Sequence, residues 1–242
     1  MKEIADRTGR FQRRPFYQTA ELDRECEEII CKYLAKKHGQ ARFPVATDDL
    51  TTLIEAHVED LDIYADLSAF GTAVEGVTIF NPGGRPSVKV TAILADDTYR
   101  ENRLRTTLTH EFGHVYFHSY LWTLDQANHP ELRFDGGKAR SNKNVQICKR
   151  ETMVDAPEVD WMEWQAGHVC GAILMPASRV RTLVLDSFTS KLGQSAWTPE
   201  SRTARDLISA VQDSFAVSRD AARVRLLRLG VLQAQTPTGS LF

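Results

Sequence analysis

The stretch from residue 101 to residue 122 constrains this chain most, because it is rich in large apolar residues yet contains several ionisable ones. At its centre lies the sequence Thr-His-Glu-Phe-Gly-His, residues 109–114, with apolar residues at most of the flanking positions. This pattern predicts a helix over 101–122 that is largely buried. Buried histidines and a buried glutamate are costly unless a partner compensates them. The fold must therefore bring such a partner to this helix.

The spacing of the histidines suits a metal ion. Positions i and i+4 of an α-helix lie on the same side, one turn apart, so His110 and His114 can bind one tetrahedral ion. Glu111 follows the first histidine and can take a proton from a metal-bound water. The sequence therefore predicts a catalytic Zn²⁺ site in which His110 and His114 are ligands and Glu111 is the general base.

A catalytic zinc site needs a third protein ligand, and Glu163 is the candidate. It lies in a helix predicted from Asp160 to Leu174, which Pro176 ends. Glu163 shares one face, at spacings of three and four, with the small residues Ala166, Gly167, Cys170 and Gly171. Small residues allow close helix approach, which would bring the glutamate to the ion. The alternative is an exposed helix charge.

Two further histidines lie near these motifs. His118 is two turns beyond His110 on roughly the same face. It is either a hydrogen-bond partner of a metal ligand or a packing histidine, and both interpretations stay open. His168 is five residues from Glu163, so we expect it to face elsewhere as a partly buried histidine.

The remaining segments predict an α+β protein. Predicted helices span 19–34, 47–56, 101–122, 160–174, 202–215 and 218–229, and predicted strands span 62–67, 74–80 and 87–94. Thr19 is the expected cap of the first helix. The turn sequence at 81–86 predicts a β-hairpin, because its glycines lack the lysine and the following helix of a phosphate loop. Residues 123–158 are predicted to be irregular.

The motif around His110, together with Glu163-x-x-Ala166-x-x-x-Cys170 and the following Leu-Met-Pro, resembles the ImmA/IrrE family of metallopeptidases. The hairpin that begins at Gly76 and the C-terminal segment 215–230 are also similar to that family. The resemblance covers about residues 19–232. It implies a zincin-like metallopeptidase core, in which a small sheet accompanies the active-site helix, followed by a C-terminal helical, helix-turn-helix-like segment.

By position, the resemblance makes His110, His114 and Glu163 the zinc ligands and Glu111 the general base. Members of the family are zinc-dependent proteases that cleave helix-turn-helix repressors encoded nearby. These repressors control mobile elements, DNA-damage genes or phage-defence operons. The resemblance therefore implies a repressor protein as the substrate of this chain.

Resemblance to the phage-defence group, sometimes called CapP-like, implies single-stranded DNA as an activator. Cationic grooves with stacking rings suit a single strand. Such groups gather in the stretch 138–150 and near the N-terminus, at Arg10, Phe11, Arg13, Arg14, Phe16 and Tyr17. A solvated basic surface is the alternative interpretation of both clusters.

Three parts are expected along the chain. Residues 1–18 form a basic, mobile N-terminal arm, and residues 19–185 form the metallopeptidase domain. That domain contains an insertion at about 119–158, because the segment between His118 and Glu163 is longer than is usual for the family. Residues 186–242 form a linker and the C-terminal helix pair.

A peptide substrate is expected to add as a strand to an exposed sheet edge, for which the arms 74–80 and 87–94 are the candidates. Cys148 lies in the insertion and could act as a cysteine switch. Its thiolate would take the open position on zinc and displace the catalytic water, with Lys149 and Arg150 favouring ionisation. The alternative is an ordinary thiol. Cys170 is a weaker candidate, because the small-residue face already explains it.

Two other functions compete with the protease. A DNA-binding transcriptional regulator with a structural zinc site is suggested by the last two predicted helices. These helices contain Arg202, Arg205, Arg219, Arg223, Arg225 and Arg228. Glu111 favours the enzyme, because a structural zinc site has no use for a base. The other competitor is a zinc hydrolase of small amides, against which only the family resemblance argues.

Composition limits the partners and the compartment. The formal net charge of the 242 residues is −2, so a nucleic-acid surface must be a local patch. Four scattered cysteines are too few for a disulfide scaffold. No apolar run reaches the ~18 residues of a membrane span, and the first residues lack the apolar stretch of a signal peptide. We therefore expect a cytoplasmic protein without a membrane partner.

Overall fold

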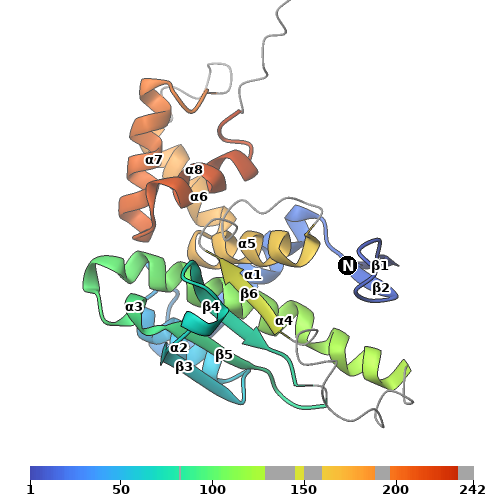
Figure 1. The fold of residues 1–242 in the computed structure, drawn as a ribbon. Coiled ribbons are helices and arrows are strands. Elements are labelled where there is room, and N and C mark those ends of the chain that lie inside the picture. The colour runs from blue at the N-terminus through green and yellow to red at the C-terminus, as the bar shows by residue number, and fades with distance from the viewer. Residues whose placement is uncertain (82, 129–144, 150–159, 189–196, 234–242) are drawn as a thin grey trace, which may run out of the picture.

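A long helix, α4 (Glu101–Asn128), runs between a small sheet and a second helix, α5 (Trp161–Leu174) (Figure 1). The structure is a computed structural model that describes residues 1–81, 83–128, 145–149, 160–188 and 197–233. Helices together with a mixed sheet confirm the predicted α+β class. In the part of the chain that is described, no helix has an apolar stretch long enough to cross a membrane.

The sheet has four strands. Across it lie, in order, β3 (Asp60–Ala65), β5 (Ser87–Thr91), β4 (Val74–Ile79) and β6 (Val145–Lys149). β3 is parallel to β5, and the other neighbours are antiparallel. β4 and β5 form the predicted hairpin, although the second arm ends earlier than expected because Ala92–Ala95 form a short helix, α3.

β6 corrects two expectations. It belongs to the segment 123–158, which was predicted to be irregular. The first residues of that segment are not irregular either, because α4 continues to Asn128. It pairs with β4 along the full length of that strand. Both arms of the hairpin are therefore interior strands, and the prediction that one of them offers a free edge to a substrate is wrong.

The first residues form a hairpin, which we call the N-terminal hairpin, from β1 (Lys2–Ala5) and β2 (Arg13–Phe16). The prediction of a mobile arm is therefore wrong. Between the two strands, Phe11 is buried and its ring lies 4.9 Å from that of Trp122 and 6.5 Å from that of Trp161. These contacts with α4 and α5 provide the apolar burial that a short two-stranded hairpin lacks by itself.

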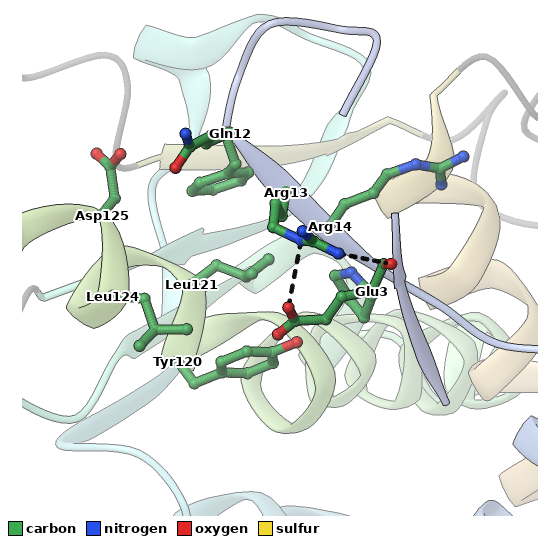
Figure 2. Close-up of a pocket in the computed structure, with 10 residues that line it drawn as sticks. Glu3, Gln12, Arg13, Arg14, Tyr120, Leu121, Leu124 and Asp125 are labelled. Atoms are coloured by element: carbon green, nitrogen blue, oxygen red, sulfur yellow. Dashed lines mark hydrogen bonds and ion pairs between the residues drawn. The ribbon is translucent and has the colours of Figure 1, made fainter. Parts of the chain in front are cut away.

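A small pocket of about 130 Å³ separates the N-terminal hairpin from the end of α4. Figure 2 shows Glu3 and Arg13 of the hairpin on one side of it and Tyr120 and Leu124 of α4 on the other. The hairpin thus lies along α4 rather than extending away from the molecule.

Most of the predicted helices begin and end within a few residues of the observed helices. Two helices precede the sheet, α1 (Thr19–His38) and α2 (Thr47–Glu55). The N-cap of α1 is Gln18 rather than Thr19, because Gln18 and Glu21 form a capping box. Two short 3₁₀ turns lie at Ser68–Phe70 and Thr98–Arg100, and a further helix, α6 (Ala177–Phe188), follows α5 without having been predicted.

The C-terminal helix pair consists of α7 (Arg202–Phe215) and α8 (Arg219–Arg228). Each helix has a serine N-cap whose hydroxyl accepts a backbone N–H three residues later. Arg225 of α8 is buried against α1 and α5, where it donates to Asp23 Oδ1 at 2.6 Å and to the Met175 carbonyl at 2.9 Å. The pair is therefore attached to the core by a buried ion pair.

Candidate metal centre

The site forms where α4 crosses α5. A Cβ atom added to Gly113 would lie 2.9 Å from the Cα of Ala166, so the two helices touch at this point. Cys170 also faces α4, where its Sγ lies 3.2 Å from Thr109 Oγ1. A Cβ atom added to Gly171 would instead lie 3.5 Å from Cδ of Arg225 of α8, which is an ordinary contact distance. The predicted close approach is confirmed at Ala166 and Cys170, while Gly171 faces another helix.

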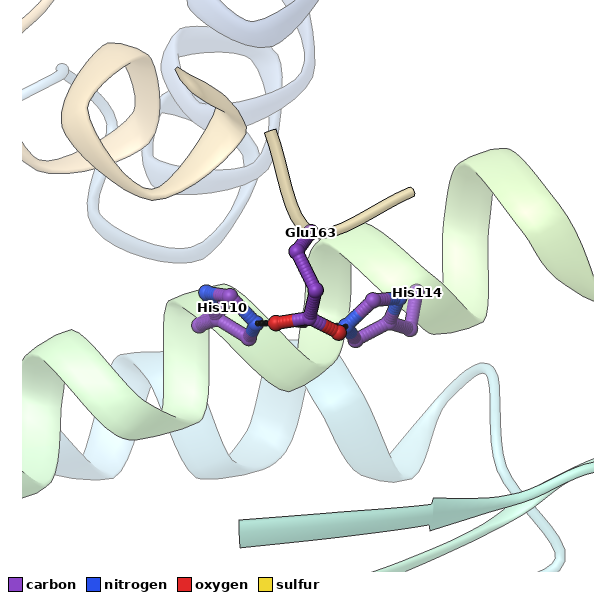
Figure 3. Close-up of side chains that lie close together, drawn as sticks. All are labelled: His110, His114 and Glu163. Atoms are coloured by element: carbon purple, nitrogen blue, oxygen red, sulfur yellow. Dashed lines mark hydrogen bonds and ion pairs between the residues drawn. The ribbon is translucent and has the colours of Figure 1, made fainter. Parts of the chain in front are cut away.

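This crossing brings His110, His114 and Glu163 together (Figure 3). The Nε2 atoms of His110 and His114 lie 3.1 Å from Glu163 Oε2 and Oε1, respectively. The two Nε2 atoms are 3.2 Å apart. Ligand atoms around a tetrahedral zinc ion with bonds of ~2.0–2.1 Å are separated by about 3.3–3.4 Å. The three predicted ligands therefore have the spacing of one face of a site that could hold a metal ion.

The charges in the cluster support this interpretation. All three side chains are buried. Burial alone would raise the pKa of Glu163, but the imidazoles of His114 and His110 more than offset it, and the pKa lies well below its ordinary value. Glu163 is thus an ionised carboxylate that faces two ring nitrogens. Either protons on these nitrogens or a metal cation can satisfy that arrangement.

Glu111 lies beside this cluster and is held by β4. Its Oε2 accepts a hydrogen bond of 2.5 Å from Thr78 Oγ1. Among the described residues, its Oε1 has no hydrogen-bond partner although it is buried. Burial raises the pKa of Glu111, against the lowering effect of His114 and His110. One oxygen of this carboxylate is anchored, the other has no hydrogen-bond partner among the described residues, and the pKa is raised. These properties suit a residue that accepts and returns a proton.

Thr78, which donates to Glu111, and Gly76, which leaves room for it, were not among the predicted site residues. A Cβ atom at Gly76 would overlap the Glu111 carboxylate, so β4 passes over the site at a glycine. A glycine inside a strand is a recognised sign of close approach by another group. That sign was present in the sequence, within the segment whose resemblance to the family was noted.

Cys148 lies on β6, opposite Gly76 of β4. Its Sγ, a nitrogen of His110 and an oxygen of Glu111 all lie within 4.8 Å of one another. The thiol is buried, and burial together with the carboxylates of Glu111 and Glu163 raises its pKa well above the ordinary value. The predicted help of Lys149 and Arg150 falls outside the described side chains. The structure thus places Cys148 next to the predicted base and one predicted ligand.

Two glutamines contact the candidate site, and the sequence analysis did not predict either of them. Gln146 of β6 donates from Nε2 to Glu163 Oε1, and its Oε1 accepts from Arg10 Nη1 at 2.6 Å. Gln165 of α5 accepts at Oε1 from His118 Nε2, at 3.0 Å. Neither glutamine belongs to a local motif, so no sequence signal identified them.

The two other histidines considered in the sequence, His118 and His168, have different surroundings. His118 is fully buried, and its Nδ1 lies 3.1 Å from Nδ1 of His114, so it is a hydrogen-bond partner of a predicted ligand. Burial, assisted by His114, lowers the pKa of His118 to about 3. His168 faces away from the site, as expected, with its Nε2 2.9 Å from Asp23 Oδ1, although it is more deeply buried than predicted.

No protein-family model matches the chain. No curated protein sequence is significantly similar to it either. The resemblance to the ImmA/IrrE family therefore stays a prediction, which depends on the motif residues alone.

Proposed function

We propose that this chain is a zinc-dependent endopeptidase of the ImmA/IrrE type, with a zincin-like core, that cleaves a helix-turn-helix repressor. The main support is one arrangement of side chains: His110, His114 and Glu163 converge on a single point, and Glu111 lies beside them with one open oxygen. Structural zinc sites close the coordination sphere with four protein ligands and need no base. Three converging ligands and an adjacent carboxylate favour catalysis.

Zn²⁺ held by these ligands would supply Lewis-acid chemistry, lowering the pKa of a water molecule and polarising a carbonyl group. Glu111 would accept the water proton at Oε1 and later return it to the leaving amine. Thr78 holds the other oxygen of Glu111 and so fixes the direction of the open one. The buried setting of Glu111 raises its pKa, which helps it hold the proton between the two steps.

β6 bears on how a protein substrate would enter. A substrate strand that pairs with β4 would need the edge that β6 occupies. Cys148 lies on this same strand and within reach of the site. We therefore include the cysteine switch in the proposal. The enzyme is inactive while β6 holds the thiol of Cys148 at the zinc site, and it becomes active when the insertion is displaced. Single-stranded DNA is the proposed activator.

The structure gives less support to the DNA-binding regulator. Arg225, on the second helix of the C-terminal pair, is buried and bound to Asp23, so it is not available to a major groove. Arg228 also contacts the core, since its Nη1 donates to the Gly167 carbonyl at 3.0 Å. Two of the arginines that suggested a regulator therefore attach the helix pair to α1 and α5.

The test is incubation of the zinc-loaded chain with the repressor encoded beside its gene. The proposal predicts one discrete cleavage by the wild type and none by Glu111→Gln, which should still bind one zinc ion because the ligands are unchanged. Sequence-specific binding to duplex DNA without cleavage would instead indicate a regulator. Hydrolysis of small amides, with the repressor left intact, would indicate the small-amide hydrolase.

A further inference from the structure

The N-terminal hairpin reaches the candidate metal centre at two separate places. On one side, the Pro15 carbonyl of β2 accepts a hydrogen bond of 3.2 Å from Gln165 Nε2. On the other side, Arg10, in the loop between the strands, donates to Gln146 Oε1 and lies over the ring of Trp122. Each contact orients a side-chain amide that in turn contacts the predicted ligands or their partners.

The first contact determines which atom donates and which accepts in a series of hydrogen bonds. A backbone carbonyl can only accept, so Gln165 must turn its NH₂ toward Pro15 and its Oε1 toward His118. An amide oxygen also only accepts, so Nε2 of His118 must bear the hydrogen. Nδ1 of His118 lies 3.1 Å from Nδ1 of His114, and one of these two nitrogens must bear the hydrogen of that bond. When His114 bears it, Nδ1 of His118 is the acceptor, and His114 keeps Nε2 as the nitrogen that can bind a metal.

That nitrogen is the one that lies 3.1 Å from Glu163 Oε1. The hydrogen-bond series Pro15–Gln165–His118–His114 therefore suits binding of a metal through the ring nitrogen that faces Glu163. Every side chain in the series is buried, so water does not compete for these bonds.

The second contact acts on the carboxylate ligand. Arg10 has only donors, so it holds Gln146 with Oε1 toward the guanidinium and NH₂ toward Glu163. Without Arg10, the carboxylate alone would orient the amide, and the amide oxygen would lose its charged donor. While β6 is in place, Arg10 thus keeps a donor next to Glu163 Oε1, the oxygen that faces His114.

We propose that the N-terminal hairpin is a working part of the metal centre, in which it orients two amides, Gln165 and Gln146, that position the ligands His114 and Glu163. Arg10, Gln165, Gln146 and His118 are positioning residues, because each acts through a ligand. This inference rests on the proposed metal site, but it concerns residues that the site's sequence motif does not contain.

The test measures the zinc affinity of the full-length chain by competition with a chromogenic chelator. Gln165→Met and Arg10→Met should each weaken binding by about 10- to 100-fold, the usual effect of removing a hydrogen-bond partner of a metal ligand. Gln165→Glu should bind within about threefold of the wild type, because either carboxylate oxygen can accept from His118 without help from Pro15. Arg13→Met is the matched control, because Arg13 is on the same hairpin and, among the described residues, its side chain bonds only to Glu3 at the surface.

A second readout separates positioning from simple packing. Nitrogen-15 spectra of the zinc-loaded wild type should show hydrogen on Nε2 of His118 and on Nδ1 of His114. In Gln165→Met, His118 should become a mixture of the two neutral forms. Circular dichroism and thermal unfolding without zinc confirm that each variant folds.

The outcomes are distinct. If the wild type binds no zinc, both the metal centre and this inference fail. If the wild type binds zinc tightly and the two methionine variants bind equally well with an unchanged His118 spectrum, the inference fails while the metal centre stands. If Gln165→Glu is as weak as Gln165→Met, the residue acts by packing and the proposed proton order is wrong.

Discussion

Glu111 packs so closely against Gly76 that no side chain fits between them. A Cβ atom at position 76 would overlap the carboxylate, whereas the glycine leaves it room. Two residues further along β4, Thr78 donates to the same carboxylate. A single strand therefore both makes space for the predicted base and holds it in place.

Gly76→Ala should reduce catalysis without removing the metal. The added methyl group displaces the Glu111 carboxylate, and a misplacement of about 1 Å can lower a rate by roughly 100-fold. Zinc should still bind stoichiometrically, since none of the three ligands contacts Gly76 in the close approach described. Repressor cleavage and zinc content are measured together. Gly84→Ala is the control, because a Cβ there meets Asn81 only at an ordinary 3.6 Å. Full activity of Gly76→Ala would show that the carboxylate need not occupy its present position.

His114→Ala should abolish stoichiometric zinc binding. Only two protein ligands would remain, and the buried carboxylate of Glu163 would lose the neighbour that most lowers its pKa. Zinc per chain is measured by atomic absorption after dialysis. His38→Ala, which changes a histidine outside the site at Asp49, should retain one zinc ion. One tightly bound zinc ion in the His114→Ala protein would refute the ligand assignment.

Cys148→Ser should cleave the repressor faster than the wild type when no activator is present. The serine hydroxyl is a poor zinc ligand, so the proposed inhibitory contact would be lost and only the hydrogen bonds to β4 would hold β6, which would then be displaced more easily. Cobalt substitution gives an independent measurement, because a thiolate bound to Co²⁺ produces a charge-transfer absorption band that the variant would lack. Cys31→Ser is the control. Equal basal rates, with no such band in the wild type, would rule out the switch.

Single-stranded DNA should raise the cleavage rate, and the increase should be smaller at higher salt. The structure revises which residues can contribute. Phe11 and Tyr17 are buried and cannot stack on bases, whereas Phe16 is exposed. Rates are compared with and without an oligonucleotide at two salt concentrations, using duplex DNA of the same sequence as control. A rate that does not respond to the oligonucleotide would reject it as the activator.

Asp23→Asn should lower the free energy of unfolding by roughly 3 kcal/mol at pH 7, because Arg225 stays buried without its countercharge. Burial opposes ionisation of Asp23, but His168 and Arg225 lower its pKa from 3.8 to about 2. Because the pKa of Asp23 is lower in the folded chain than in the unfolded chain, its charge stabilises the fold at pH values above the unfolded pKa. This contribution is lost as pH falls from about 4 to about 2.

The difference between the wild type and Asp23→Asn should therefore shrink over that acidic interval. Urea unfolding at several pH values measures it, with the exposed Asp206→Asn as control. A difference that stays constant down to pH 2 would show that the Asp23 charge contributes nothing to stability.

The predictable parts of this molecule are those whose signal is local. The i, i+4 histidines and the small residues at Ala166 and Cys170 lie within single helices, and the β4–β5 hairpin has its own turn sequence. Helix periodicity placed α1, α5, α7 and α8 to within a few residues. The α+β class and the convergence of His110, His114 and Glu163 follow from these elements.

The features that sequence reasoning missed depend on distant partners. β6 is only five residues long and is stabilised by β4, which lies far away in the chain. The N-terminal hairpin is ordered because Phe11 packs against Trp122 and Trp161. Gln146 acquires its role from Arg10, 136 residues away, and Gln165 from Pro15, 150 residues away. An amide side chain has no preferred role until such neighbours orient it.

The acceptor that Gln165 finds at Pro15 belongs to the main chain. A scan of single amino-acid replacements leaves that carbonyl in place, so changes at position 15 that fit the buried space of the proline would score as neutral. Insertion or deletion of one residue in β2 would shift the carbonyl along the strand and remove the bond. Tolerance of substitution at this position, combined with intolerance of any change in length, is therefore the genetic pattern expected of the hairpin.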